Sequence, residues 1–170
     1  MARPKVIIDG YNMIHAVPDL AARLKQDLGS ARIALLQRLC SYVSNRNLEL
    51  VVVFDGAQVH PVEDARAAPP GVRVLFSRPP QTADSLIEHL LHNEAHPRSV
   101  TLVSADRRLG DVARERGTSV LSPAQFLKRM DKRPRGEDLA DHKFGRELSE
   151  EEMAEWLALF GERMPRTPRL

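Results

Sequence analysis

The sequence of 170 residues predicts an α/β fold in which a parallel sheet is covered by helices on both faces. Five short apolar runs rich in β-branched residues lie at residues 5–8, 49–54, 72–76, 99–104 and 118–121. Their apolar residues are nearly continuous rather than alternating, which is typical of strands buried on both faces. Helical patterns lie between most of these runs, and such alternation indicates parallel strand pairing.

Four helices are predicted from apolar spacing and from end signals. They cover residues 30–46, 82–93, 107–116 and 122–130. Thr82 and Ser122 are good N-cap residues, and Pro and Gln follow Ser122 at the first and third helical positions. Gly117 is placed where a glycine commonly ends a helix.

Two regions do not fit this alternation. Residues 56–71 contain three prolines and predict a long loop, and the chain turns polar and strongly charged after Met130. We therefore expect a folded domain over residues 1–131 and a charged extension over residues 132–170. Ser149 opens a capping box for a short helix in that extension, and the apolar stripe around Trp156 could dock on the domain or on a second copy. We expect a monomer or a weak homodimer.

Composition excludes several classes of protein. The net charge of +2 gives no global basic field, and the single cysteine, Cys40, allows neither an internal disulfide nor a cysteine-rich metal site. No apolar stretch is long enough for a signal sequence or a membrane span. We expect a cytoplasmic protein that does not contact a membrane.

Four aspartates occupy positions that a parallel sheet would bring to one edge. Asp9 and Asp55 end the first two apolar runs, Asp106 follows the fourth, and Asp84 lies in the first turn of a predicted helix. Ligands of open α/β sheets bind outside the carboxyl ends of the strands, and clustered carboxylates suit a divalent cation such as Mg²⁺ or Mn²⁺. A single aspartate at a strand end is also an ordinary helix cap or turn former. The residue pattern alone leaves both interpretations open.

Four short strings together resemble a known family. They are Asp-Gly-Tyr-Asn at residues 9–12, Val-Phe-Asp-Gly at 53–56, Thr-Ala-Asp-Ser-Leu-Ile-Glu at 82–88 and Ser-Ala-Asp at 104–106. In this order they resemble the YacP-like NYN family of the PIN-like nucleases, over residues 4–130. The resemblance implies a three-layer PIN-like fold with strand order 3-2-1-4-5. It also implies a Mg²⁺- or Mn²⁺-dependent endoribonuclease that acts on RNA, in particular on mRNA in association with ribosomes.

The resemblance also assigns roles to residues. Asp9, Asp84 and Asp106 take the family's metal-binding positions, and Asp55 matches the acid after the second strand. Asn12 matches a polar residue of the first loop, and Ser104 matches the Ser or Thr before the last acid. Ser85 stands where PIN-like sites often carry a further acid, which puts a second metal ion in doubt. Glu88 lies one helical turn beyond Asp84, on the same face. It could be a further acid behind the metal-binding residues, and a solvent-facing position is the favoured interpretation.

RNA would need a basic approach surface and polar contacts beside the acids. Arg107 and Arg108 open a predicted helix, where backbone N–H groups also attract phosphate. Tyr11 is placed to stack on a base or to pack internally, and His15 to contact phosphate or carry a proton. A basic run supplies the remaining candidates, each of which could equally be a solvated surface side chain: Lys128, Arg129, Lys132 and Arg133.

Two other functions remain open at this point. Ser85 and the charged C-terminal segment favour an RNA- or ribosome-binding module with a weak or vestigial metal site. A metal-dependent phosphatase is less consistent with the sequence, because the first strand is not followed by Asp-x-Asp. The chain also has no Gly-Lys-Ser/Thr phosphate loop.

Overall fold

The computed structural model describes residues 2–44, 46–56, 68 and 70–132. The chain divides into two units, residues 1–133 and 134–170, and the second lies wholly outside the described residues. The helix expected from Ser149, the stripe around Trp156 and the basic residue Arg133 therefore lie outside the described part. So does most of the loop expected at residues 56–71.

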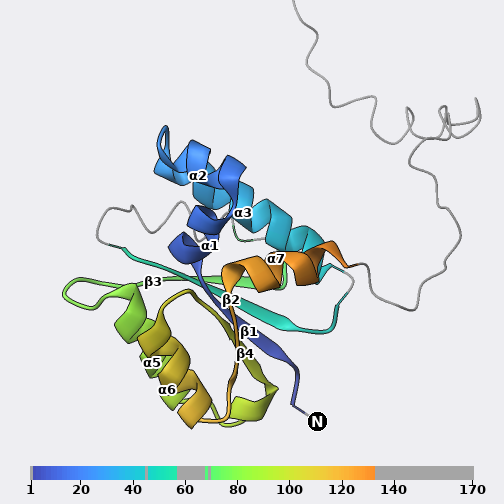
Figure 1. The fold of residues 1–170 in the computed structure, drawn as a ribbon, viewed down its shortest axis with the longest axis vertical. Coiled ribbons are helices and arrows are strands. Elements are labelled where there is room, and N and C mark those ends of the chain that lie inside the picture. Colours follow the sequence, from blue (N-terminus) through green and yellow to red (C-terminus); the bar gives the residue numbers. More distant parts are fainter. Residues whose placement is uncertain (1, 45, 57–67, 69, 133–170) are drawn as a thin grey trace, which may run out of the picture. The chain divides into compact units, whose positions relative to one another are not determined.

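The predicted parallel sheet is confirmed. It contains β1 (Lys5–Asp9), β2 (Glu49–Phe54), β3 (Val72–Phe76), β4 (Val100–Val103) and β5 (Ser119–Leu121). Their order is β3-β2-β1-β4-β5, and every pairing is parallel (Figure 1). In the register of the three central strands, Ile8 lies between Val52 on β2 and Val103 on β4.

Helices cover both faces of the sheet. One face carries α1 (Gly10–Ala16), α2 (Pro18–Leu24), α3 (Leu28–Val43) and α7 (Pro123–Asp131), and the other carries α5 (Ala83–His92) and α6 (Arg107–Glu115) (Figure 1). Alternate strand residues enter two separate cores: Val6 and Ile8 pack under the first group, and Ile7 packs under the second. The continuous apolar runs are explained by this two-sided burial. Among the described helices, none combines the length and apolar character needed to cross a bilayer.

The end signals of the later helices are confirmed. The hydroxyl of Thr82 accepts the backbone N–H of Ser85 at the start of α5, and Ser122 and Gln125 form a reciprocal capping box at the start of α7. Gly117 follows α6 with a φ of 81°, a conformation that glycine adopts without strain.

The first connection differs from the sequence-based prediction. Residues 10–24 form the two short helices α1 and α2, so Asn12 lies in a helix and not in a loop. Each has 7 residues, about two turns, which is too short for an apolar period to stand out. Helix α3 begins at Leu28 and not at Ser30, because the carboxylate of Asp27 accepts the N–H groups of Gly29 and Ser30.

A close contact fixes the geometry where β1 enters α1. A Cβ placed on Gly10 would lie 2.3 Å from Cε1 of Phe54, whose ring is fully buried between Tyr11 and Phe76. We predict that Gly10→Ala lowers the free energy of unfolding by about 1–3 kcal/mol, because the buried ring has little room to move. Gly29→Ala is the matched control, since its Cβ would meet no atom closer than 3.7 Å. Urea denaturation that gives the two variants equal stability would contradict this account.

An ion pair at the opposite end of the sheet gives a pH-dependent contribution to stability. Nζ of Lys5 lies 2.6 Å from Oε2 of Glu94, and this hydrogen bond lowers the pKa of Glu94. A lowered carboxyl pKa stabilises the fold above the unfolded-state pKa, and this contribution is lost as the pH falls through the folded-state pKa. We predict that Lys5→Met destabilises the protein at neutral pH and that the difference from wild type disappears in acid. Denaturation at several pH values measures this, with the exposed lysine variant Lys128→Met as control.

Candidate active site

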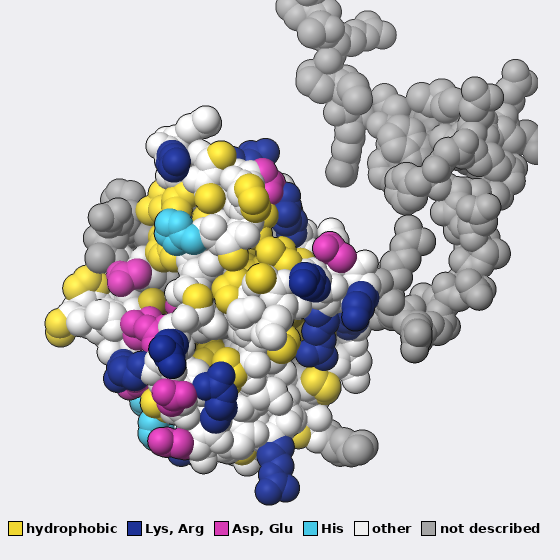
Figure 2. Space-filling model, viewed as in Figure 1, with side chains coloured by type: hydrophobic (Ala, Val, Ile, Leu, Met, Phe, Trp, Pro, Cys, Tyr) yellow, Lys and Arg dark blue, Asp and Glu magenta, His cyan; other side chains and the backbone are white. Residues whose placement is uncertain are grey.

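The fold brings the predicted acids to one edge of the sheet. The chain leaves β1 into α1 on one face and leaves the neighbouring β4 into α6 on the other, so a crevice forms where they diverge. Asp9 is the last residue of β1, Asp55 follows β2, Asp106 precedes α6, and Asp84 is the second residue of α5. Figure 2 shows acidic side chains gathered on this side of the molecule, with Lys or Arg side chains directly beside them.

Asp9 is the most deeply buried of these acids, with 4% of its surface exposed. Its Oδ1 accepts the backbone N–H of Asn12 at 3.3 Å, and its Oδ2 accepts the side-chain amide of Asn12 and, at 3.4 Å, the hydroxyl of Ser104. Burial raises the pKa of Asp9, and the charge of Asp84 raises it further. The hydrogen bonds oppose this shift but do not cancel it, so the ionised carboxylate is held at a cost.

Asn12 and Ser104 connect the two strands that border the crevice. The side-chain carbonyl of Asn12 accepts the backbone N–H of Ala105 at 3.3 Å, so one side chain joins the end of β1 to the turn after β4. The hydroxyl of Ser104 donates to Asp9 and accepts the backbone N–H of Asp106 at 3.1 Å. Both residues therefore position Asp9 relative to Asp106, which agrees with their predicted place beside the acids.

Asp106 and Asp9 are also helix caps. Oδ1 of Asp106 accepts the N–H of Leu109 at 2.9 Å, and Asp9 caps α1 through Asn12. The ordinary interpretation of a strand-end aspartate thus holds for both residues. It does not compete with a metal-binding role, because a carboxylate has several lone-pair positions and a cap uses only one or two of them.

Asp84 lies at the electrostatic centre of the cluster. It does not cap α5, because Thr82 does so. Partial burial raises its pKa most, and the charges of Asp106, Glu88 and Asp55 raise it further, while Arg108 lowers it. The acids that are distant in sequence therefore act on one another through space.

The acids are gathered without forming a closed metal site. Within the described ranges, no group of three or more His, Cys, Asp or Glu side chains is close enough to hold a metal ion. The donor set nevertheless fits a hard divalent cation, because carboxylate oxygens are its preferred ligands and these acids act on one another: the charges of Asp106 and Asp55 act on Asp84, and that of Asp84 acts on Asp9. Asp9, Asp84 and Asp106 are the residues that could hold such a cation.

Glu88 differs from its expected solvent-facing position. Its side chain is 25% exposed, and its Oε1 lies 2.6 Å from Nη2 of Arg108, which ties α5 to α6 beside the acids. Arg108 is 66% exposed and pairs with Glu88, so it compensates part of the negative charge around Asp84 from outside the crevice. Ser85 serves the helix start, with its hydroxyl 3.0 Å from that of Thr82.

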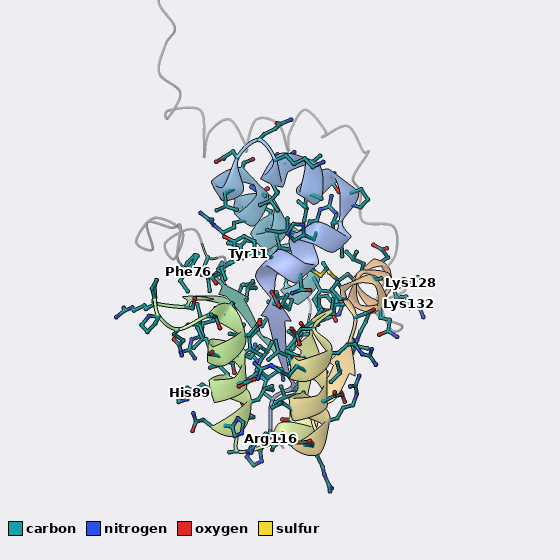
Figure 3. The ribbon with its side chains drawn as sticks, turned by 60° about the vertical axis from the view of Figure 1, so that its left-hand side comes forward. Tyr11, Phe76, His89, Arg116, Lys128 and Lys132 are labelled. Carbon is teal, nitrogen blue, oxygen red and sulfur yellow. The ribbon has the colours of Figure 1, made fainter. Side chains whose placement is uncertain are left out.

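Tyr11 packs internally. Its ring contacts Phe54 edge-on at a centroid distance of 5.2 Å, and its hydroxyl accepts a hydrogen bond from Nη1 of Arg32 at 3.2 Å. Figure 3 shows Tyr11 where β1 enters α1. These contacts favour the packing interpretation over base stacking. Arg32, which is 6% exposed, is not among the site residues predicted from the sequence. Its helical spacing with Leu35, Leu36 and Leu39 is the signal that could have indicated its burial.

The other predicted RNA contacts are spread over the surface. His15 is exposed in the last turn of α1, and Arg107 is exposed in the first turn of α6, next to Asp106. Lys128, Arg129 and Lys132 are exposed in or just after α7, and Figure 3 shows Lys128 and Lys132 well separated from Tyr11. The basic run is therefore not part of the acidic crevice.

Comparison with known proteins gives the class of protein. A parallel sheet in the order 3-2-1-4-5 with helices on both faces matches the fold of the PIN-like nuclease superfamily. The chain belongs to the YacP-like NYN domain family of that superfamily, whose model matches residues 6–159. The match extends past residue 131, where the sequence analysis placed the end of the domain; that boundary remains a prediction.

Individual relatives agree with this assignment. The chain is 35% identical over 85 residues to the uncharacterized protein YacP of Bacillus subtilis (strain 168), a match that covers 50% of this chain and 49% of that protein. The alignment thus spans about half of the relative's length. The crystal structure of Rae1 (YacP) from Bacillus subtilis matches with a TM-score of 0.60 and 28% identity over 76% of this chain and 74% of that one. The crystal structure of a tryptophan-to-leucine mutant of Rae1 matches with a TM-score of 0.59 and 28% identity over 74% and 73% of the two chains.

The bridge made by Asn12 gives a test of the site's internal structure. We predict that Asn12→Ala lowers the free energy of unfolding by about 1–3 kcal/mol, because the buried carboxylate of Asp9 loses a donor. The loss should be smaller when Asp9 is already alanine, since that interaction is then absent. A double-mutant cycle measured by chemical denaturation gives the coupling, and a value near zero would contradict the bridge.

Proposed function

We propose that this chain is a metal-dependent endoribonuclease that hydrolyses phosphodiester bonds in RNA with Mg²⁺ or Mn²⁺. The observation that carries the proposal is the gathering of Asp9, Asp84 and Asp106 where β1 and β4 diverge, with the pKa values of Asp9 and Asp84 raised. Burying carboxylates beside one another destabilises their ionised forms, and a bound divalent cation would offset that cost.

The residues of the site have distinct roles in this proposal. Asp9, Asp84 and Asp106 hold the cation, and Asp55 adds negative charge beside Asp84. A bound divalent cation supplies Lewis acidity for the attack of water and for the charge that develops on the leaving oxygen. Asn12 and Ser104 keep Asp9 and Asp106 in fixed register through their hydrogen bonds.

The choice of RNA as substrate rests on the family. Membership of the YacP-like NYN family supports a nuclease, and the family resemblance points to mRNA cleaved in association with ribosomes. Such a role would place the protein in the cytoplasm. Arg107, which follows Asp106 directly, would contact the strand near the acids, and His15 at the end of α1 is a further candidate.

We predict that the purified chain cleaves single-stranded RNA with Mn²⁺ or Mg²⁺ and leaves 5′-phosphate and 3′-hydroxyl ends. Asp9→Asn and Asp84→Asn should each lower the cleavage rate by at least about a hundredfold, because each removes a charge at the centre of the site. Asp19→Asn, which changes an exposed carboxylate on α2, is the matched control and should retain activity. End mapping of the products and rate measurement check both statements.

Metal binding provides a readout that does not depend on activity. Calorimetric titration with Mn²⁺ should show binding to wild type and to Asp19→Asn, and much weaker binding to Asp84→Asn. Cleavage that persists in excess EDTA, or an Asp84→Asn variant that cleaves normally, would rule the mechanism out.

A second candidate function is an RNA- or ribosome-binding module with a weak or vestigial metal site. It is favoured by the finding that, in the described part of the chain, no three acids lie close enough together to hold a metal ion, and by Ser85 in place of a further acid. Full-length protein that binds RNA or ribosomes but cleaves neither free nor ribosome-bound RNA with Mn²⁺ would support this function over the nuclease.

A further inference from the structure

A cleft of about 440 Å³ lies beside the acids, at the edge of the sheet where α6 and α7 flank β5. It opens next to Ser104 and Asp106, and its far wall is formed by Val120 of β5 and by Ser122 and Gln125 at the start of α7. The volume lies within the range of small-ligand pockets. Because Asp106 belongs to both, the cleft is continuous with the candidate active site.

The walls of the cleft carry donors suited to a phosphate. Arg107 has no ion-pair partner among the described residues. The one ion-pair partner of Arg114 in the described part of the chain is Asp111, and the side chains of Arg114 and Asp111 are 62% and 72% exposed. Exposed pairs of this kind are weak, so Arg114 is available to a stronger anion. In the capping box Gln125 donates its backbone N–H and accepts through its side-chain carbonyl, and its side-chain amide nitrogen has no hydrogen-bond partner within the described ranges.

A glycine keeps the cleft open. Gly110 lines it from α6, and a Cβ at this position would lie 3.2 Å from Nη1 of Arg114 and 3.6 Å from Cγ1 of Val120. Glycine in a helix interior is destabilising relative to alanine. Any longer side chain at Gly110 would extend between the arginine and the wall of β5, and would therefore fill the space.

We propose that this cleft binds the nucleotide next to the scissile phosphate of a single-stranded RNA, with Arg107 and Arg114 contacting its phosphate. The inference rests on the proposed nuclease function and assigns it a substrate subsite. A strand whose reacting phosphate lies at Asp106 continues directly into the cleft. Val120 and Gly110 provide an apolar surface for the sugar or the base, while the contacts to phosphate are independent of sequence.

The test uses the full chain and RNA oligonucleotides with a mapped cleavage site. The double variant Arg107→Gln with Arg114→Gln should raise KM about tenfold, because it removes charge-assisted hydrogen bonds to phosphate, and should leave kcat almost unchanged. The KM effect should disappear for a substrate shortened on one side of the cleavage site, because the subsite is then empty. Gly110→Gln should reproduce this pattern by filling the cleft.

Matched variants separate the subsite from general charge effects. Arg98→Gln removes an exposed arginine beside the amino end of β4, at the opposite end of the sheet, and should leave KM unchanged. Unchanged KM in the arginine double variant, or an equal effect of Arg98→Gln, would overturn the proposal even if Gly110→Gln failed to fold.

A binding measurement separates failure of the subsite from failure of the proposed function. Fluorescence anisotropy with the same RNA in EDTA should show that the double variant binds more weakly. The slope of log K against the logarithm of the salt concentration should become shallower by about one for each lost phosphate contact. If the cleft variants weaken RNA binding but no metal ion supports cleavage, the nuclease function is refuted and the RNA subsite stands. If the chain cleaves RNA and the cleft variants change neither binding nor KM, the nuclease function stands and the subsite is refuted. A mononucleotide that competes as well as the strand would also overturn the proposal.

Discussion

The burial of one carboxylate at the end of β1 is the constraint on which the site depends. Asp9 ends the central strand, is almost fully enclosed, and remains held by Asn12 and Ser104 although burial and the charge of Asp84 raise its pKa. A protein selected for stability alone would be expected to replace such a group with a neutral one. Its hydrogen bonds instead define the distance between the end of β1 and the turn that begins α6.

The rest of the edge is organised around that carboxylate. Gly10 allows α1 to begin against the buried ring of Phe54. The hydroxyl of Ser104 hydrogen-bonds both to the carboxylate of Asp9 and to the backbone N–H of Asp106, so it fixes Asp106 relative to Asp9. On the other face, the pair of Glu88 and Arg108 joins α5 to α6 and brings a positive charge towards Asp84. The acids are thus held in place by capping, packing and ion pairing, each of which operates without a metal ion.

This arrangement is consistent with a site that a cation and a nucleic acid strand complete together. Among the residues that the structure describes, the acids interact electrostatically but no three of them are close enough together to hold a metal ion, and Arg107 and Arg114 of α6 line the cleft beside Asp106. In phosphoryl-transfer sites, Mg²⁺ usually keeps several waters and shares its coordination with substrate phosphate, so few direct protein bonds are required. The basic residues of α7 are separated from the acidic crevice, so under the proposed function Arg107 and Arg114, and not the basic run, would contact the reacting part of a strand.

The sequence by itself determined the strands, the later helices with their caps, and the presence of four acids on one edge. These features depend on short-range patterns: apolar runs, N-cap residues such as Thr82 and Ser122, and aspartates at strand ends. The strand order and the family followed from four short motifs. Tertiary structure alone decided the helical state of residues 10–24, the internal packing of Tyr11 on Phe54 and Arg32, the pairing of Glu88 with Arg108, and the cleft beside Asp106. Each of the side-chain contacts joins residues on different elements, and a linear pattern carries no information about which side chains meet across a sheet or between two helices.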